Sequence, residues 1–278
     1  ADDKTEVTSG RIIQRFLLME LPAGGIRVLN KEGMVLGDIW GLQFDRFLTE
    51  DDFNADGSLK AGLPDQTKVF PAGYQFAPGD VLYKDLDNNG EIVKQTNTND
   101  KGDLSVIGNA LPRLQFGLNL DAAWKGFDIS MFFQGVAKRK LWAAGNQVLP
   151  GFTTGEPFYK GAEDYWTPEN TDAFYPRPMD YKQSASGNYS VNDRYLLNMA
   201  YLRLKTFTVG YSLPKVWLSK FKVQGLRVYF TGENLFTIDG VKPAIDPEIG
   251  IRTASGKSDQ RNFGRSYPYQ KTASSYSA

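Results

Sequence analysis

The chain has 278 residues, and its 32 Lys and Arg residues balance its 32 Asp and Glu residues. This balance argues against nucleic acid, whose binding needs a basic excess, and against a polybasic protein of the membrane surface. The chain has no cysteine and no histidine, which excludes a disulfide scaffold, a thiolate zinc site, a cysteine nucleophile and a histidine base. These absences remove most catalytic groups, and a hydrolase that uses only carboxylates is still consistent with the composition.

Aromatic residues make up 13% of the chain, and it contains 28 glycines. Both features favour a β-rich fold with many turns. No apolar run reaches the roughly 18 residues of a membrane-spanning helix, but barrel strands are short and alternate in polarity. Residues 1–4 (ADDK) do not resemble a secretory signal, and we expect that the chain begins inside a longer protein.

The first part of the chain combines weak strand patterns with a long polar segment. Strands are predicted at residues 8–20 and 36–48. Residues 50–107 then show little periodicity, as do residues 137–199 further along. Loops of this length are unusual in a compact soluble domain, whereas outer-membrane barrels carry them on the extracellular side.

One acidic turn in the first long segment has the spacing of a calcium loop. Asp85, Asp87 and Asn89 alternate ahead of Gly90 and Glu91, as in the first half of an EF-hand loop, where Glu91 would offer its carbonyl oxygen. All these ligands are hard oxygens, so Ca²⁺ in a structural role is the expected ion. The alternative is an acidic Asx-turn without metal.

The calcium interpretation has one gap and one possible repetition. The twelfth loop position is Thr96, which cannot supply the usual bidentate carboxylate, so Asp100 or Asp103 would have to replace it. An earlier turn repeats the oxygen spacing with Asp52, Asn54 and Asp56. It too has the Asx-turn as its alternative.

Residues 114–134 give the clearest hairpin signal. Every second residue from Leu114 to Trp124 is apolar, and the alternation resumes at Phe127 after the two-residue turn Lys125-Gly126. In a transmembrane barrel the apolar face would contact lipid, and the polar residues Gln115, Asn119, Asp128 and Ser130 would face the lumen. A hairpin of a soluble β-sandwich has the same pattern.

Two further strands are predicted at residues 201–211 and 226–234. The apolar parity of the first changes near Lys205, which predicts a β-bulge there. The connector at residues 213–218 predicts a turn with a short helical piece. With a last strand at residues 267–276, we expect roughly eight strands of about ten residues each.

Seven runs, taken in order, resemble the SusC/RagA family of TonB-dependent transporters. Two of them are residues 124–135 (WKGFDISMFFQG), similar to the family's YKGFDLSxFFQG, and residues 201–214 (YLRLKTFTVGYSLP), similar to YLRLKNLTLGYSLP. The others are residues 33–41 (GMVLGDIWG), 79–90 (GDVLYKDLDNNG), 106–112 (VIGNALP), 165–177 (YWTPENTDAFYPR) and 226–237 (LRVYFTGENLFT). Together they extend over nearly the whole chain.

The resemblance implies an all-β fold in which residues 1–278 form the C-terminal part of an antiparallel transmembrane barrel of about 22 strands. It further implies an outer-membrane importer of oligosaccharides or peptides, not an enzyme, in a Gram-negative, Bacteroidetes-like bacterium. The implied partners are a SusD-like lipoprotein lid, TonB acting through the plug, the remaining barrel strands and outer-membrane lipid. The family's signal peptide, TonB box, plug and final aromatic residue are not in this sequence, so we expect a fragment, a truncated product or one segment of a split barrel.

Aromatic residues of the second long segment are candidates for contact with substrate or lid, because aromatic rings stack on the C–H faces of sugars. The candidates are Trp142, Tyr159, Trp166 and Tyr175. The alternative is that these rings pack the loops together or against the lid.

Two other functions, a soluble carbohydrate-binding module and a hydrolase, are alternatives to the importer. A soluble, calcium-dependent carbohydrate-binding module of β-sheet would explain the aromatics and the acidic turns, but not the ordered motifs. A hydrolase would need paired carboxylates, for which the candidates are Glu163 with Asp164 and Glu169 with Asp172. Surface loops of many proteins contain such pairs.

Overall fold

The computed structural model describes residues 35–94, 101–143, 145, 147–151, 162–179, 187–221, 223–242, 245–248, 253–254, 257–258 and 271–277. The chain divides into two compact units. Unit 1 comprises Ala1–Leu111, Lys140–Leu197 and Ile251–Arg265, and unit 2 comprises Pro112–Arg139, Asn198–Gly250 and Ser266–Ala278. The strand predicted at residues 8–20 lies outside the described residues. Across the residues that are described, no helix has the length and apolar character to cross a membrane.

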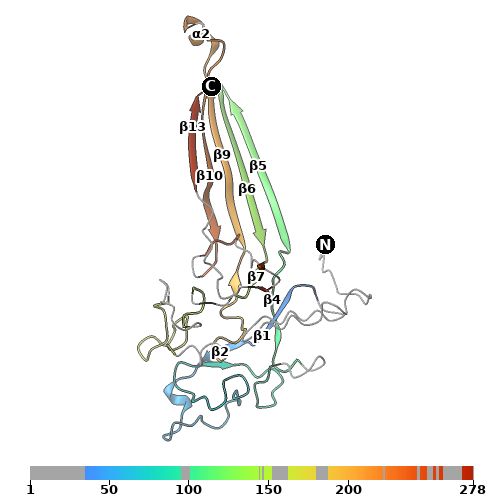
Figure 1. The fold of residues 1–278 in the computed structure, drawn as a ribbon, viewed down its shortest axis with the longest axis vertical. Coiled ribbons are helices and arrows are strands. Elements are labelled where there is room, and N and C mark those ends of the chain that lie inside the picture. The colour runs from blue at the N-terminus through green and yellow to red at the C-terminus, as the bar shows by residue number, and fades with distance from the viewer. Residues whose placement is uncertain are drawn as a thin grey trace, which may run out of the picture. The chain divides into compact units, whose positions relative to one another are not determined.

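Unit 2 is a single antiparallel sheet of five strands (Figure 1). Their order across the sheet is β13-β10-β9-β6-β5. The bounds are β5 (Leu114–Trp124), β6 (Phe127–Ala137), β9 (Tyr201–Ser212), β10 (Arg227–Asp239) and β13 (Thr272–Ser277). The first four have 11 to 13 residues each, enough for a tilted strand to cross a bilayer.

The predicted hairpin is confirmed, including its turn. β5 and β6 pair without interruption from Leu114 opposite Ala137 to Trp124 opposite Phe127. Lys125 and Gly126 both have positive φ, 47° and 89°. Positive φ at both turn residues is the type I′ geometry, whose twist matches that of the flanking strands.

The predicted bulge at Lys205 is also confirmed. Thr206 lies opposite Phe132 of β6, whereas Leu204 lies opposite the very next residue, Phe133. Lys205 is therefore the extra residue, and the pairing with β10 shifts at the same point. The bulge returns Leu204 to the apolar face after the change of parity, as the sequence pattern requires.

The connector between β9 and β10 contains the predicted helical piece. It consists of α2 (Lys215–Leu218) followed by the 3-10 helix η3 (Ser219–Phe221). Pro214 precedes α2 with φ −60° and ψ 135°, which suits a residue whose ring fixes φ at a helix start.

Unit 1 is built from short strand pairs and long irregular segments. The pairs are β1 (Asp38–Gly41) with β4 (Ser105–Asn109), β2 (Phe44–Phe47) with β3 (Val81–Tyr83), β7 (Lys140–Leu141) with β8 (Leu197–Asn198), and β11 (Thr253–Ala254) with β12 (Lys257–Ser258). The 3-10 helix η2 (Glu50–Asp52) follows β2. A buried cluster forms a core, comprising Leu42, Phe47, Val69, Phe70, Val81, Tyr83, Ile92, Leu104, Trp166 and Ala173.

The prediction of one long strand at residues 36–48 was wrong. The segment forms β1 and β2, which pair with different partners, because the backbone between them turns to another neighbour. Leu42 N donates to Val191 O at 2.9 Å, and Leu42 is fully buried. Gly41 permits this approach, since a Cβ there would lie 2.8 Å from Val191 O.

The expectation of about eight strands of ten residues was too high for the described part of the chain. Four strands have that length, β13 has six residues, and every other strand has two to five. Of the last predicted strand, only residues from 271 onward are described. The long segments fold into the core of unit 1 instead of adding strands to the sheet.

Candidate functional site

One face of the unit 2 sheet is continuous and apolar. Opposite residues of paired antiparallel strands point to the same face, and one such row runs from Leu118 through Phe133 and Leu204 to Phe236. The predicted parity, even numbers in β5 and odd numbers in β6, is confirmed. Many of these side chains are exposed, among them Leu114, Phe116, Leu118, Leu120, Trp124, Phe127, Val228, Phe230, Phe236 and Ile238. An exposed apolar face of this extent indicates contact with an apolar environment.

The opposite face is polar and carries an ion pair across three strands. Arg227 of β10 binds Asp128 of β6, with Nε 3.1 Å from Oδ1. The pair spans β9 at Gly210, where a Cβ would lie 2.5 Å from Arg227 Nη2 and 2.7 Å from Asp128 Oδ1. A larger residue there would displace the ends of these two side chains from their present positions. The predicted polar residues Gln115, Asn119, Asp128 and Ser130 all lie on this face.

A buried ionic cluster lies on the polar face of β9, at the end away from the hairpin turn. Arg203 Nη2 lies 2.7 Å from Asp246 Oδ1, and its Nη1 lies 3.0 Å from Glu248 Oε2. Lys205 Nζ lies 2.7 Å from Glu248 Oε1, and Arg203 Nε donates to Thr237 Oγ1 at 2.7 Å. Two cations and two carboxylates therefore hold the segment after β10 against the wall.

The acidic turn at residues 85–91 brings three carboxylates together. Oxygens of Asp85, Asp87 and Asp103 all lie within 4.8 Å of one another. Asp103 thus approaches the position that Thr96 cannot fill, and such spacing suits oxygens around one Ca²⁺ at 2.3–2.6 Å. Asn89 turns its oxygen elsewhere, since Oδ1 accepts from Glu91 N at 2.8 Å.

Backbone amides and neighbouring charges set the pKa values in this turn. Desolvation raises the pKa of Asp85, but the backbone N–H groups of Gly90, Asn88 and Asn89 outweigh it, and the pKa is lowered overall. The pKa of Asp87 is raised, first by desolvation and then by the nearby carboxylate of Asp103. A bound cation would relieve this repulsion.

Other contacts occupy the remaining acidic residues of the turn. The Glu91 side chain pairs with Lys68, and Asp103 accepts hydrogen bonds from Leu86 N at 2.8 Å and Val93 N at 2.7 Å. The two amides hold Asp103 in place, one at each carboxylate oxygen. Calcium binding at Asp85, Asp87, Asn89 and Glu91 stays a prediction.

In the earlier turn, each predicted ligand has a protein partner. The Asp52 carboxylate accepts hydrogen bonds from Arg46 Nη1 at 2.6 Å, from Arg46 Nη2 at 2.7 Å and from Thr49 N at 2.8 Å. The Arg46 hydrogen bond is the main reason that the pKa of Asp52 falls to about 2. Asp56 accepts from Ser58 N, and Asn54 donates to Ser58 Oγ. These are features of a capped Asx-turn, and metal binding there stays untested.

The aromatic candidates Trp142, Trp166 and Tyr175 are buried within unit 1, and Tyr159 lies outside the described residues. Tyr175 donates its hydroxyl to Val148 O at 3.0 Å, and burial raises its pKa to about 12. The Trp166 ring covers Gly79, where a Cβ would come within 2.5 Å of it. These rings pack segments of the unit together, and their contact with substrate or lid stays a prediction.

One buried network was not identified as a site from the sequence. Asp80, fully buried, accepts hydrogen bonds from Tyr74 Oη at 2.9 Å, Arg177 Nε at 2.9 Å, Asn188 Nδ2 at 3.0 Å and Ala77 N at 2.9 Å. Asp80 and Arg177 lie in two of the family-like runs, residues 79–90 and 165–177. That shared membership was the available signal, and the network gives Asp80 and Arg177 a structural role within these runs.

The sequence is similar to curated TonB-dependent receptors, although no family model matches it. It is 29% identical over 243 residues to TonB-dependent receptor P3 of Formosa agariphila, covering 85% of this chain and 21% of the receptor. It is 33% identical over 192 residues to receptor P26 of the same organism, covering 67% and 18%. Identity to TonB-dependent receptor SusC of Bacteroides thetaiotaomicron is 25% over 210 residues, covering 72% and 20%. The chain thus spans about a fifth of the length of these relatives.

The fold is similar to solved structures of RagAB. The structure of the RagAB peptide transporter aligns with a TM-score of 0.54 and 18% identity, over 92% of this chain and 24% of that one. The RagAB peptide importer in its open-open state aligns with a TM-score of 0.52 and 17% identity, over 94% and 24%. These relatives are receptors and transporters rather than enzymes. The ordered motifs, the open five-stranded sheet and the relatives together identify the chain as part of the C-terminal β-barrel portion of a SusC/RagA-like TonB-dependent transporter.

Proposed function

We propose that the chain forms part of the wall of a TonB-dependent nutrient importer in the outer membrane of a Bacteroidetes-like bacterium. The observation that carries this proposal is the continuous apolar face of four strands of 11 to 13 residues, which is exposed on β5, at Phe127 of β6 and on β10, and is backed by a polar face. Strands of this length and alternation match the hydrocarbon layer, with lipid on one side and a wet lumen on the other.

The lengths of the connections give the proposed orientation. At one end of the sheet, β5 and β6 are joined by two residues, and β9 and β10 by residues 213–226. At the other end, β6 leads to β9 through residues 138–200, and β10 leads to β13 through residues 240–271. Barrels keep short turns on the periplasmic side and long loops outside, so the connections of residues 138–200 and 240–271 would leave the sheet on the extracellular side.

The proposed partners follow from the SusC and RagAB likeness. They are a SusD-like lipoprotein that caps the barrel, TonB acting through the plug, and the remaining barrel strands. The strands β5 and β13 lie at the two edges of the sheet, where backbone groups are available to further strands. The proposed substrates are oligosaccharides or peptides, and the peptide alternative is supported by the function named for RagAB.

We also propose that Asp85, Asp87 and Asp103 hold Ca²⁺ as a structural clip in unit 1. Their mutual spacing and the absence of histidine and cysteine from the chain support a hard-oxygen site. The ion would join the turn at residues 85–91 to the segment around Asp103, and so stabilise the loop without taking part in transport chemistry.

The importer is tested with the complete gene. A strain lacking the transporter is compared with the same strain complemented by the intact gene, on oligosaccharides or peptides as the limiting nutrient. We expect growth on one substrate class to need the gene, and to be lost again when TonB is removed. Growth that depends on neither would contradict the proposal.

The soluble carbohydrate-binding module makes a different prediction for the purified protein. It would be a detergent-free monomer, and its sheet would have its apolar face covered. In the part of unit 2 that the structure describes, that face is exposed, which favours the membrane protein.

A further inference from the structure

The connector between β9 and β10, residues 213–226, begins beside the turn of the neighbouring hairpin. Ser212 N donates to Gly126 O at 2.8 Å, and Leu213 N donates to Leu226 O at 2.9 Å. The helix α2 projects beyond the ends of the strands there (Figure 1). Under the orientation proposed above, this is the periplasmic end of the wall.

The geometry of α2 turns two apolar side chains outward. Trp217 N and Leu218 N both donate to Pro214 O, which closes the helical turn. Leu218 is 5% exposed, and its side chain lines the hollow beside α2 together with Leu213 and Leu226. Residues of a helix follow one another at about 100°, so Val216 projects on the side opposite to Leu218. Val216 is 74% exposed and Trp217 is 59% exposed.

The connector is basic, although the chain as a whole is neutral. Residues 213–226 contain Lys215, Lys220 and Lys222 and no carboxylate. The adjoining hairpin turn also places a lysine beside an exposed tryptophan. Lys125 Nζ lies 4.8 Å from the ring centre of Trp124, which is 70% exposed. Exposed tryptophan beside lysine is typical of side chains that lie at the headgroup level of a bilayer.

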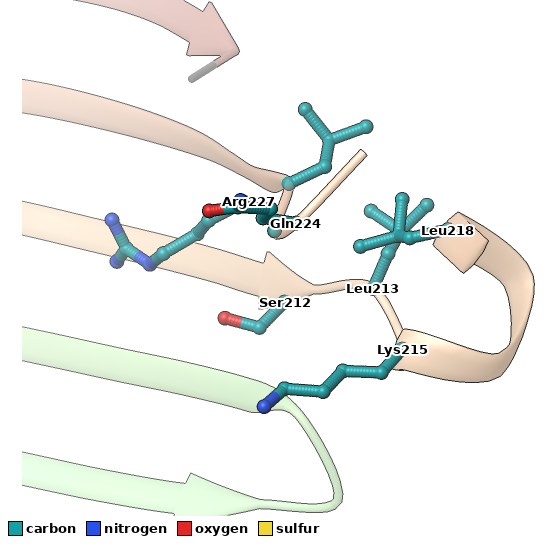
Figure 2. Close-up of a pocket in the computed structure, with 8 residues that line it drawn as sticks. Ser212, Leu213, Lys215, Leu218, Gln224 and Arg227 are labelled. Atoms are coloured by element: carbon teal, nitrogen blue, oxygen red, sulfur yellow. The ribbon is translucent and has the colours of Figure 1, made fainter. Parts of the chain in front are cut away.

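A hollow of about 330 Å³ lies beside α2, and Figure 2 shows the residues that line it. Leu213, Leu218 and Leu226 make it apolar, and the side chains of Lys215 and Arg227 extend back along the strands (Figure 2). The guanidinium of Arg227 is held by Asp128 on the polar face, so the cation beside the recess is Lys215. An apolar recess beside a lysine matches the glycerol region and the phosphate of a phospholipid.

We propose that residues 213–226 anchor the barrel wall in the phospholipid leaflet at this end, with Val216 and Trp217 inserted among the headgroups and Lys215 and Lys220 on the phosphates. The proposal rests on the importer's barrel being in a membrane. Two features favour lipid over a protein partner. Leu213 and Leu226 continue the parity of the apolar residues of β9 and β10 to the start of the connector, and the positive charge complements anionic headgroups.

The test uses the complete transporter in vesicles of phosphatidylethanolamine and phosphatidylglycerol. Because this region has no cysteine, single spin labels are placed by Val216→Cys, Trp217→Cys, Leu118→Cys and Ser58→Cys. Collisions with oxygen report lipid, and collisions with a nickel chelate report water. We expect labels at 216 and 217 to collide several-fold less with nickel than the label at 58, an exposed position of unit 1.

A second comparison isolates the charge. Lys215→Gln combined with Lys220→Gln should move the label at 216 toward water in these vesicles. In vesicles of phosphatidylcholine alone, the lysine pair should make little difference. Equal nickel collision in both lipids, with and without the lysines, would overturn the electrostatic part of the proposal.

The label at 118 separates this proposal from the importer itself. Lipid contact at 118 with water contact at 216 and 217 overturns the anchor and leaves the importer intact. Water contact at 118 overturns the importer. Labels at 216 and 217 that meet water in vesicles but are protected in whole cells would identify a periplasmic protein as the occupant, and would overturn the lipid anchor.

Discussion

Apolar side chains are buried in a core in unit 1, whereas many of those in the sheet of unit 2 are exposed. In unit 1, Leu42, Tyr83 and Ile92 are buried together, and buried polar groups such as Asp80 are saturated by hydrogen bonds. In the sheet, Leu118 and Phe127 are exposed, and the ion pairs lie on the other face. One region is stabilised by its own core, whereas the other requires an apolar environment from outside.

The largest loss of stability is expected when the buried hydrogen-bond network of Asp80 in unit 1 is broken. Asp80→Ala leaves the Arg177 guanidinium and the Asn188 amide without their common acceptor. Breaking a buried pair from one side costs about 3–5 kcal/mol. Amide hydrogen exchange in the complete transporter should show loss of protection at residues 74–81 and 187–193.

The matched control for Asp80 is Asp45→Ala, at an exposed position of β2, which should leave the exchange pattern unchanged. Protection in the sheet should persist in both variants if the two regions are stabilised separately. Simultaneous loss of protection in the sheet would show that the two regions are stabilised together.

The next effect tests the sheet. Leu118→Arg places a charge on the apolar face and should cost about 2–4 kcal/mol if the residue lies at the middle of the bilayer. Asn119→Arg, on the polar face, should cost much less. Reversible unfolding from vesicles by urea measures both, and equal costs would remove the distinction between the faces.

A smaller loss of stability is expected at acid pH, through the pair of Arg46 and Asp52. The pKa of Asp52 is lowered to about 2 by Arg46, so its contribution to stability is complete above the ordinary carboxyl pKa near 4 and is lost as the pH falls from there toward 2. Arg46 is partly exposed and solvent screens the pair, so we expect on the order of 1–2 kcal/mol. Hydrogen exchange around η2 should rise over this window, and Asp52→Asn should abolish the pH dependence. Unchanged exchange at acid pH would show that the pair does not stabilise the turn.

The smallest effect is expected at the acidic turn. A site lacking the twelfth-position carboxylate should bind Ca²⁺ on the order of 10⁻⁴ M, in the range of extracellular modules. A chelator should then speed proteolysis within residues 85–94, and Asp85→Ala with Asp87→Ala should be cut at the chelated rate throughout. An Asx-turn without metal would give one rate in all four conditions.

The sequence pattern predicted the structure correctly where an element is formed by residues that are close together in the chain. We predicted the hairpin of β5 and β6, its turn at Lys125 and Gly126, and the bulge at Lys205. These predictions succeeded because the alternation of apolar residues, and the point where its parity changes, can be read from adjacent residues. The same reasoning failed at residues 36–48. There the alternation continues, but the backbone at Leu42 pairs with a segment about 150 positions away.

The sequence by itself determined the strand type, the apolar and polar faces of the sheet and, through its ordered motifs, the transporter resemblance. Tertiary structure alone decided that Asp103 joins Asp85 and Asp87, that Arg177 reaches Asp80 across 97 positions, and that Trp142 is buried. The physical reason is distance along the chain. A side chain's face in a strand follows from its immediate neighbours, whereas its partner in a compact unit depends on the path of every segment between the two.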